Sequence, residues 1–372
     1  MTARKRLVVS AVNFSEGGPL TVLIESLDAA AATLGTEWEI VALVHDAGLI
    51  TNPRIRTLAF PDSKRSWLKR LQLEWQGFKA LSTQLQPDLW VSLHDITPRV
   101  LARRQAVYCH NPSPFYRITW REALLEPKFV LFNLFYAQLY RVFIQRNAAV
   151  VVQQHWLRQA FSRLYRHPNI IVAHPGQQPA PGGAPEAPRR QEGSAGSPMV
   201  LLYPALPRVF KNIEVVCQAM ATLPEALARR LDVRFTLDGS ENRYARHLVR
   251  RYGSTPGVHF IGRQSRSQMA EQYARCDAVL FPSKLETWGL PITEAKTLGK
   301  PLLVADLPYA HEAVGTYDKV AFIAPTDPKA WAAALHGLVN GTWRYPGQTA
   351  APPAAPFAPD WPALWLLLTK GL

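Results

Sequence analysis

Short apolar runs alternate along this chain with longer stretches in which apolar residues recur at helical spacing. Strand-like runs occupy residues 7–12, 39–45, 89–93, 105–109 and 148–152, and then residues 199–203, 233–237, 259–261, 278–281, 301–305 and 321–323. Alternation of strands with amphipathic helices is typical of parallel, doubly wound sheets that carry helices on both faces. Because such sheets bind ligands beyond the carboxyl ends of their strands, functional residues are expected directly after these runs.

Two stretches rich in proline interrupt the alternation. Residues 177–198 are rich in Pro, Gly and Ala, a composition that favours a linker or surface loop over a packed element. Residues 346–362 are also Pro-rich and lead into an apolar segment that is typical of a short helix. We therefore predict an N-terminal α/β domain over residues 1–176, a C-terminal α/β domain over residues 199–341, and a tail with a helix over residues 342–372.

Two glutamates, Glu286 and Glu294, stand eight positions apart on either side of a predicted helix start. Pro291 suits the first helical position, where its missing N–H costs nothing, and Glu294 then falls in the first turn. The N–H groups near Gly289 and Leu290 point outward at the positive end of the helix dipole, which is a place to hold a phosphate. A glutamate at a helix start also complements the dipole without any ligand. A phosphate site beside two carboxylates that accept hydrogen bonds from hydroxyls nevertheless describes a nucleotide sugar.

A pair of cations, Arg208 and Lys211, follows the strand-like run at residues 199–203. Arginine offers a planar fork that matches phosphate oxygens, and lysine offers a mobile point charge. Both side chains can reach one anion from a loop at the carboxyl end of a strand, although surface charge alone also explains such a pair.

Two more motifs follow strand-like runs. Gly17 and Gly18 stand between the first run and a predicted helix, where a backbone without side chains can approach a ligand closely. His110 lies just past another run, where an imidazole could contact a bound sugar or orient a second substrate. A structural histidine is the alternative. His94 and Asp95 also follow a run and are candidates of lower rank.

The segment from Phe281 to Val314 resembles the donor-binding segment of retaining family 4 glycosyltransferases of the GT-B fold. The resemblance rests on Glu286, Gly289, Leu290, Pro291, Glu294 and Ala295, then on Gly299, Lys300 and Pro301, and on Asp306, Leu307 and Pro308. Trp288 departs from the family pattern, which more often has a smaller or different aromatic residue there. The resemblance implies two Rossmann-like, doubly wound parallel-sheet domains that face each other across a cleft.

The resemblance also implies roles for the residues that follow the strands. Glu294 would hold the nucleotide ribose and Glu286 the hydroxyls of the sugar. Arg208 and Lys211 would bind the diphosphate, and His110 would contact the donor sugar. Catalytic roles thus fall to His110, Glu286, Arg208 and Lys211, and the donor is expected to contact Gly17, Gly18, Arg208, Lys211, Glu286, Trp288, Gly289, Leu290 and Glu294.

The chain contains no Asp-x-Asp pair, through which glycosyltransferases that chelate the diphosphate usually bind a metal. Arg208, Lys211 and the helix start would replace the cation. We therefore expect no metal site and no cofactor apart from the nucleotide-sugar co-substrate.

These expectations together describe a retaining, metal-independent hexosyltransferase. It would move a sugar from a nucleotide-diphosphate sugar to a glycan or lipid-linked acceptor. The segments around residues 92–97 and 110–115 are closest to enzymes of bacterial surface-polysaccharide assembly, which points to lipopolysaccharide and O-antigen synthesis. A nucleotide-sugar epimerase-like enzyme and an inactive nucleotide-sugar-binding protein of the same fold are the alternatives.

Charge and composition narrow the partners and the compartment. The net charge is +14 with a pI of about 9.9, and residues 1–175 hold 21 Lys or Arg against 12 Asp or Glu. No nucleic-acid-binding motif accompanies these charges, so no nucleic-acid partner is expected, whereas an anionic membrane surface is. Three scattered cysteines and no run of transmembrane length favour a reducing, cytoplasmic location.

An aromatic run could carry the membrane contact. It comprises Phe129, Leu131, Phe132 and Phe135, beside Lys128 and Arg141. We expect it to dock peripherally on the inner face of the cytoplasmic membrane. The alternative is an ordinary buried helix.

Overall fold

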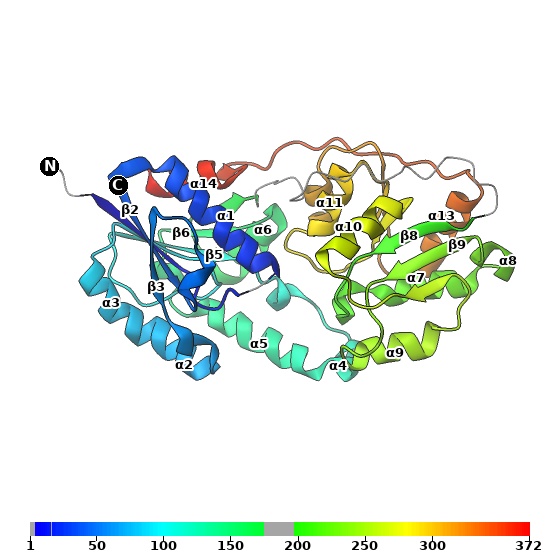
Figure 1. Ribbon diagram of the computed structural model, residues 1–372, viewed down its shortest axis with the longest axis horizontal. Coiled ribbons are helices and arrows are strands. Elements are labelled where there is room, and N and C mark those ends of the chain that lie inside the picture. Colours follow the sequence, from blue (N-terminus) through cyan, green and yellow to red (C-terminus); the bar gives the residue numbers. More distant parts are fainter. Residues whose placement is uncertain (1–3, 16, 175–196) are drawn as a thin grey trace. The chain divides into compact units, whose positions relative to one another are not determined.

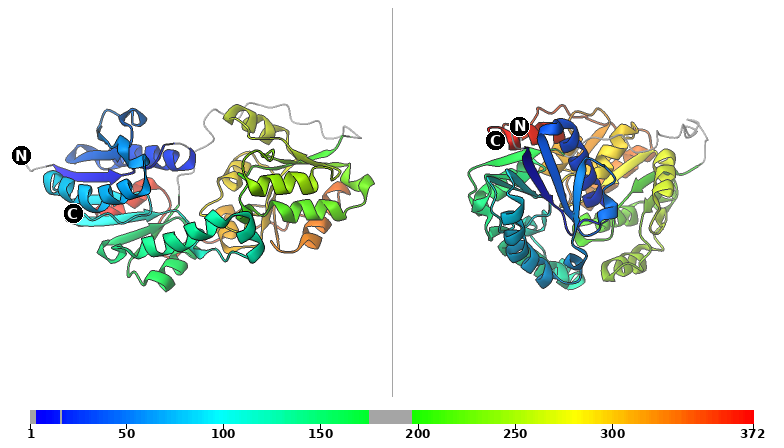
Figure 2. Two further views of the ribbon diagram at one scale, coloured as in Figure 1. Left: turned by 90° about the horizontal axis from the view of Figure 1, so that it is seen from below. Right: turned by 60° about the vertical axis from the view of Figure 1, so that its left-hand side comes forward.

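The computed structural model describes residues 4–15, 17–174 and 197–372. The chain forms two compact units, and each contains one of the two sheets drawn in Figures 1 and 2. The first unit comprises Met1–Phe115, Asn133–Gln177 and Pro353–Leu372, and the second comprises Tyr116–Phe132 and Gln178–Pro352. The stretch predicted as a linker, residues 177–198, lies outside the described residues except for its last two.

The sheet of the first unit has eight strands in the order β14-β7-β6-β5-β4-β1-β2-β3, and all neighbours are parallel. The strands are β1 (Lys5–Ser10), β2 (Trp38–Val44), β3 (Ile55–Ala59), β4 (Leu89–Ser92), β5 (Arg104–Cys109), β6 (Ala149–Val152), β7 (Ile170–Ala173) and β14 (Phe357–Ala358). The apolar pattern predicts five of them and misses β3, β7 and β14. The edge strand β3 has only one buried residue, Ile55, so it does not read as an apolar run.

The second unit has a six-stranded sheet in the order β10-β9-β8-β11-β12-β13, again with parallel neighbours only. Its strands are β8 (Met199–Tyr203), β9 (Leu231–Phe235), β10 (Val258–Phe260), β11 (Ala278–Phe281), β12 (Leu302–Ala305) and β13 (Val320–Ile323). Each of the six corresponds to a predicted run. The expected α/β class with two doubly wound parallel sheets is therefore confirmed.

Helices follow most strands (Figure 1). Those of the first unit are α1 (Gly17–Thr33), α2 (Trp67–Gln72), α3 (Phe78–Leu85), α6 (His155–Tyr165) and α14 (Trp361–Thr369). Those of the second are α4 (Trp120–Leu125), α7 (Ile213–Thr222), α8 (Glu225–Ala228), α9 (Arg243–Tyr252), α10 (Arg266–Arg275), α11 (Leu290–Thr297), α12 (Pro308–Val314) and α13 (Pro328–Val339). Helix α5 (Pro127–Arg141) begins in the second unit and ends in the first.

The central strand β1 shows why helices cover both faces of the first sheet. Successive side chains of a strand point to opposite faces. Leu7 packs in a core with Leu23 of α1, whereas Val8 packs in another core with Phe78 of α3. All four side chains are fully buried, as expected for a parallel sheet between helical layers.

The last helix, α14, completes the core of the first unit. Trp365 is fully buried there, and its indole N–H donates to the carbonyl oxygen of Ser26 in α1 over 2.8 Å. Arg104 at the start of β5 donates to the carbonyl oxygens of Leu368 and Lys370, each over 2.8 Å. The predicted C-terminal helix is therefore present, and it belongs to the same core as β1.

Candidate functional site

The turn after β11 presents Glu286 and leads into α11. Gly289 caps this helix with φ +85°, a conformation that disfavours side chains, and a Cβ there would lie 3.1 Å from the ring of Phe281. The helix begins at Leu290, one residue earlier than expected. Glu294 is consequently its fifth residue, and the first turn contains no acidic side chain. The prediction that Glu294 lies in the first turn is wrong, because the glycine cap allows the helix to start before Pro291.

Lys211 and Glu286, both predicted from sequence, lie together at the carboxyl ends of the neighbouring strands β8 and β11. The ammonium Nζ of Lys211 is 2.5 Å from Oε1 of Glu286, and the side chains are 17% and 13% exposed. The hydroxyl of Tyr203, the last residue of β8, donates to the carbonyl oxygen of Lys211 over 2.7 Å and fixes the loop. An anion arriving here would share the lysine with an existing carboxylate.

Arg208 lies three residues before Lys211 but has a different partner. Its Nε is 2.7 Å from Oε1 of Glu126, a residue between α4 and α5. A second link of the same kind joins Lys284 to Glu122 in α4 over 3.1 Å. The segment Tyr116–Phe132 is thus held to the second unit by two ion pairs, which sequence patterns did not anticipate.

Glu294 also has a partner that the sequence did not reveal. The hydroxyl of Tyr273 in α10 donates to Oε2 of Glu294 over 2.5 Å. Burial and the neighbouring Glu294 carboxylate raise the pKa of Tyr273 well above its usual value, so the phenol keeps its proton. Tyr273 is the single buried residue of α10 and its one aromatic residue, and that was the only signal in the sequence.

Two other predicted donor contacts differ in exposure. Leu290 is half exposed at the start of α11. Trp288 is buried, and its indole N–H donates to the hydroxyl of Thr293 over 2.9 Å. Trp288 therefore supports the turn between the two glutamates and presents little surface to a ligand.

In the first unit, the predicted residues lie at the ends of β1 and β5. Gly17 and Gly18 are the first two residues of α1, so the prediction that they precede the helix is wrong. His110 follows β5, with Nε2 3.6 Å from Oδ2 of Asp95. The ring of Phe14 packs against the imidazole edge-on at 5.4 Å.

Asp95 organises the turn that contains His110. It adopts a left-handed conformation, φ 71°, and its Oδ1 accepts the backbone N–H of His110 over 2.7 Å and that of Asn111 over 3.1 Å. The hydroxyl of Tyr140 in α5 donates to the same oxygen over 2.8 Å. A strained, buried carboxylate with three donors indicates a constrained position for the histidine.

A buried ionic cluster lies beneath this turn. Arg70 donates from Nε to Glu74 over 2.8 Å and from Nη2 to both Nδ1 and the carbonyl oxygen of His94 over 3.1 Å. Glu74 lies in a π-helical turn, Leu73–Gly77, a type of turn that is frequent at functional sites. Burial raises the pKa of Glu74 to about 7 despite the nearby Arg70. Burial also lowers the pKa of His94 well below its usual value, so the imidazole is neutral.

Across residues 4–15, 17–174 and 197–372, no three His, Cys, Asp or Glu side chains come together in a way that could hold a metal ion. The expectation that the reaction needs no metal stays a prediction.

The sequence has relatives among characterised proteins. Residues 185–345 match the family "Glycosyl transferases group 1". The D-inositol 3-phosphate glycosyltransferase of Stackebrandtia nassauensis is 30% identical over 183 residues, which cover 46% of this chain and 41% of that protein. The O-antigen chain mannosyltransferase RfbU of Salmonella typhimurium is 28% identical over 81 residues, 22% of each chain. The chain therefore matches less than half of the length of these relatives.

The fold has relatives that extend over nearly the whole chain. Sucrose-phosphate synthase from Thermosynechococcus elongatus superposes with a TM-score of 0.67 at 17% identity, covering 91% of this chain and 90% of that one. Anabaena HepE in complex with UDP-glucose superposes with a TM-score of 0.59 at 17% identity, covering 91% and 90%. At such identities the likeness establishes the fold. The chain thus has the GT-B fold, and its residues 185–345 are similar to the glycosyl transferases group 1 family.

Proposed function

We propose that this protein is a glycosyltransferase that takes its sugar from a nucleotide-diphosphate sugar. The observation that carries the proposal is the contact between Lys211 and Glu286 at the carboxyl ends of β8 and β11, with Glu294 on the helix that follows. A cation for a departing phosphate then lies next to carboxylates for sugar and ribose hydroxyls. The complex of HepE with UDP-glucose supports this class of donor.

Breaking the bond between sugar and diphosphate places negative charge on the leaving group. Lys211 and Arg208 stabilise that charge, and they need no reorganisation because ion pairs already hold them in place. The second carboxylate oxygen of Glu286 would accept a hydrogen bond from a sugar hydroxyl. We propose that the acceptor attacks the oxocarbenium-like sugar from the face of the leaving group, whose phosphate takes the acceptor proton, so that the anomeric configuration is retained.

We propose a hexose as the sugar and a glycan or lipid-linked molecule as the acceptor, in the assembly of bacterial surface polysaccharide such as O-antigen. The names of two relatives, an O-antigen chain mannosyltransferase and a D-inositol 3-phosphate glycosyltransferase, support this assignment.

A screen of the purified protein against UDP-, GDP- and ADP-sugars tests the proposal. Release of free nucleoside diphosphate identifies the donor, and addition of lipid or glycan acceptors should convert hydrolysis into transfer. An epimerase would instead change the sugar without releasing nucleotide, and an inactive binding protein would bind a donor and leave it intact. Either outcome would contradict the proposal.

We expect replacement of Glu294 by alanine to weaken donor binding by about 1.5–3 kcal/mol, because charge-assisted hydrogen bonds to the ribose are lost. Calorimetry with the donor from the screen measures the effect. Tyr273→Phe is the companion variant, since it removes the hydroxyl that donates to Glu294 and leaves the carboxylate in place. Unchanged nucleotide affinity in Glu294→Ala would show that Glu294 does not bind the ribose.

We expect sugar transfer to continue in EDTA at an undiminished rate. Arg208 and Lys211 supply positive charge at the proposed diphosphate site, and the chain lacks an Asp-x-Asp pair. A rate that falls to zero in EDTA and returns with magnesium or manganese would show that a metal carries the diphosphate instead.

We also propose that helix α5 contacts an anionic membrane. Its exposed face carries Leu131, Leu134 and Phe135, and no residue of the helix is acidic. In α2, Trp67 is 42% exposed and its ring packs edge-on against Phe135 at 5.6 Å, which widens the apolar face. Phe129, which we expected on this surface, is buried and is excluded from the contact. No helix in the described parts of the chain is long and apolar enough to cross a membrane.

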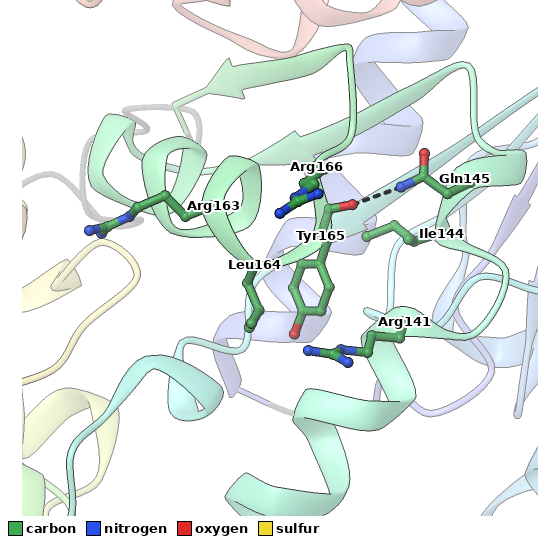
Figure 3. Close-up of a pocket in the computed structure, with 7 residues that line it drawn as sticks. All are labelled: Arg141, Ile144, Gln145, Arg163, Leu164, Tyr165 and Arg166. Carbon is green, nitrogen blue, oxygen red and sulfur yellow. Dashed lines mark hydrogen bonds between the residues drawn. The ribbon is translucent and has the colours of Figure 1, made fainter.

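Residues at the carboxyl end of α5 and from α6 line a hollow, and three of them are arginines (Figure 3). The hollow measures about 470 Å³ and is lined by Arg141, Ile144, Gln145, Arg163, Leu164, Tyr165 and Arg166. Among the described residues, three arginines and no carboxylate line it, so it suits the phosphates of lipid headgroups.

Liposome sedimentation tests this contact. We expect the protein to bind anionic but not neutral vesicles, and high salt to release it, because each basic side chain near the surface contributes about 1 kcal/mol that salt screens. Leu134→Asp should weaken binding, whereas Leu366→Asp, at another exposed leucine of the first unit, should not. Equal recovery with both vesicle types would refute the contact.

A further inference from the structure

The donor site of the second unit includes a segment from far upstream in the sequence. Glu126 and Phe129 belong to Tyr116–Phe132, yet they contact the loop around Arg208 more than 75 residues later. We propose that Glu126 and Phe129 are positioning residues that hold Arg208 ready for a diphosphate. This inference rests on the proposed function, which needs Arg208 at the leaving group.

Three contacts fix the guanidinium of Arg208. Glu126 is 2.7 Å from Nε, and Cζ lies 4.9 Å from the ring centre of Phe129 and 5.7 Å from that of Phe210. The two phenyl rings also pack on each other at 5.3 Å. The Glu126 carboxylate lies beside Nε as an ion pair without a hydrogen bond, and the two rings lie against the guanidinium. The terminal nitrogens then remain to meet the oxygens of a phosphate in a bidentate manner.

Glu126 fixes the backbone of the loop as well. Its Oε2 accepts the backbone N–H of Val209 over 2.7 Å, so one carboxylate holds both the side chain of Arg208 and the residue after it. The Glu126 side chain is only 12% exposed. A buried carboxylate is costly unless it is fully paired, so its two contacts act together.

The neighbouring pair strengthens the same connection. Glu122 accepts from Lys284 and from the hydroxyl of Tyr116, and the backbone N–H of Lys284 donates to the carbonyl oxygen of Phe210 over 2.7 Å. Burial alone would raise the pKa of Glu122, but hydrogen bonds from Thr119 and Tyr116 together with the charge of Lys284 lower it. The carboxylate therefore stays ionised, and the segment is anchored at Lys284 as well as at Arg208.

A preformed arginine binds an anion more tightly than a mobile one, since its conformational freedom is lost before the ligand arrives. Glu126 also has an effect that weakens anion binding, because its charge repels a phosphate and neutralises part of the arginine charge. The geometry favours positioning: the carboxylate contacts Nε and the Val209 amide, and two aromatic rings add to the hold.

Calorimetry on the full chain tests the proposal. Wild-type protein is titrated with UDP, GDP and ADP, and the diphosphate that binds is compared with the nucleoside of the same base. We expect Glu126→Ala to weaken binding of the diphosphate about tenfold and to leave binding of the nucleoside unchanged. Glu225→Ala is the control, because Glu225 pairs with Arg229 on the surface of the same unit.

A double-mutant cycle separates positioning from a general structural role. In the Arg208→Ala background, adding Glu126→Ala should cause no further loss of diphosphate affinity, because the residue that Glu126 holds is gone. Should the alanine variant fail to fold, Glu126→Gln takes its place, since it keeps the size and an acceptor oxygen while removing the charge.

Several results would overturn the inference. Equal losses for diphosphate and nucleoside would indicate a structural role, and tighter diphosphate binding would make Glu126 a competitor for Arg208. An unchanged affinity would leave Glu126 with no part in the site. A wild-type protein that binds none of the diphosphates would instead refute the proposed function, so the two failures are distinguishable.

Discussion

Lys211→Ala should lower kcat/KM for sugar transfer by about 100- to 1,000-fold, the range found when one group that stabilises developing negative charge is removed. The lysine lies 2.5 Å from Glu286 in a largely buried pair, and the proposed reaction places new charge on the phosphate next to it. Steady-state kinetics with the donor and acceptor from the screen measure the loss. Lys329→Ala, at an exposed position at the start of α13, should leave the rate unchanged.

The alanine variant also leaves Glu286 unpaired, and that carboxylate could repel the donor by itself. The double variant Lys211→Ala with Glu286→Gln removes this repulsion. If the lysine stabilises the leaving group, the rate stays low in the double variant. A rate restored to that of Glu286→Gln alone would show that Lys211 only neutralises the carboxylate.

Trp365→Ala should destabilise the first unit by about 3–5 kcal/mol, the usual cost of removing a large buried aromatic side chain. Trp365 of α14 is fully buried, and the variant also loses the hydrogen bond from the indole N–H to the carbonyl oxygen of Ser26. Urea unfolding followed by circular dichroism measures the change. Leu366→Ala, exposed on the next position of the same helix, is the control and should change stability by no more than about 0.5 kcal/mol.

A loss below about 1 kcal/mol in Trp365→Ala would mean that α14 is only loosely attached to the first unit. The second unit should keep its own transition in both variants, because its core contains no residue of α14.

Strands β8, β11, β12 and β13 of the second unit were predictable because strands of a parallel sheet are buried on both faces and read as continuous apolar runs. Strands β9 and β10 include polar residues and are less regular in the sequence. The same rule fails for β3, which has exposed positions at the sheet edge, and for β14, which has only two residues. Association of α14 with β1 depends on contacts between the two ends of the chain, about which a local pattern carries no information.

The residues of the candidate site also divide into those that the sequence could predict and those that it could not. Glu286 and Lys211 could be predicted because both follow strands, where open α/β sheets bind ligands. Their direct contact could not, since it depends on the order of β8 and β11 in the sheet. Tyr273 and Glu126 lie in or beside helices with no distinguishing spacing, so only the folded chain shows them next to Glu294 and Arg208.

The position of α14 in the sequence has a consequence for synthesis on the ribosome. Seven strands of the first sheet emerge early, but the helix that covers part of one face is made only after the whole second unit. Apolar side chains such as Leu7 therefore lack the packing of Trp365, which belongs to the same core, until nearly the entire chain has been translated. Domains tend to fold from the N-terminus onward during translation, so this nascent chain exposes an incomplete core for most of that time. We expect chaperones that bind apolar surface to bind the first unit during translation. They should dissociate once α14, which ends at Thr369, has left the ribosome and packed.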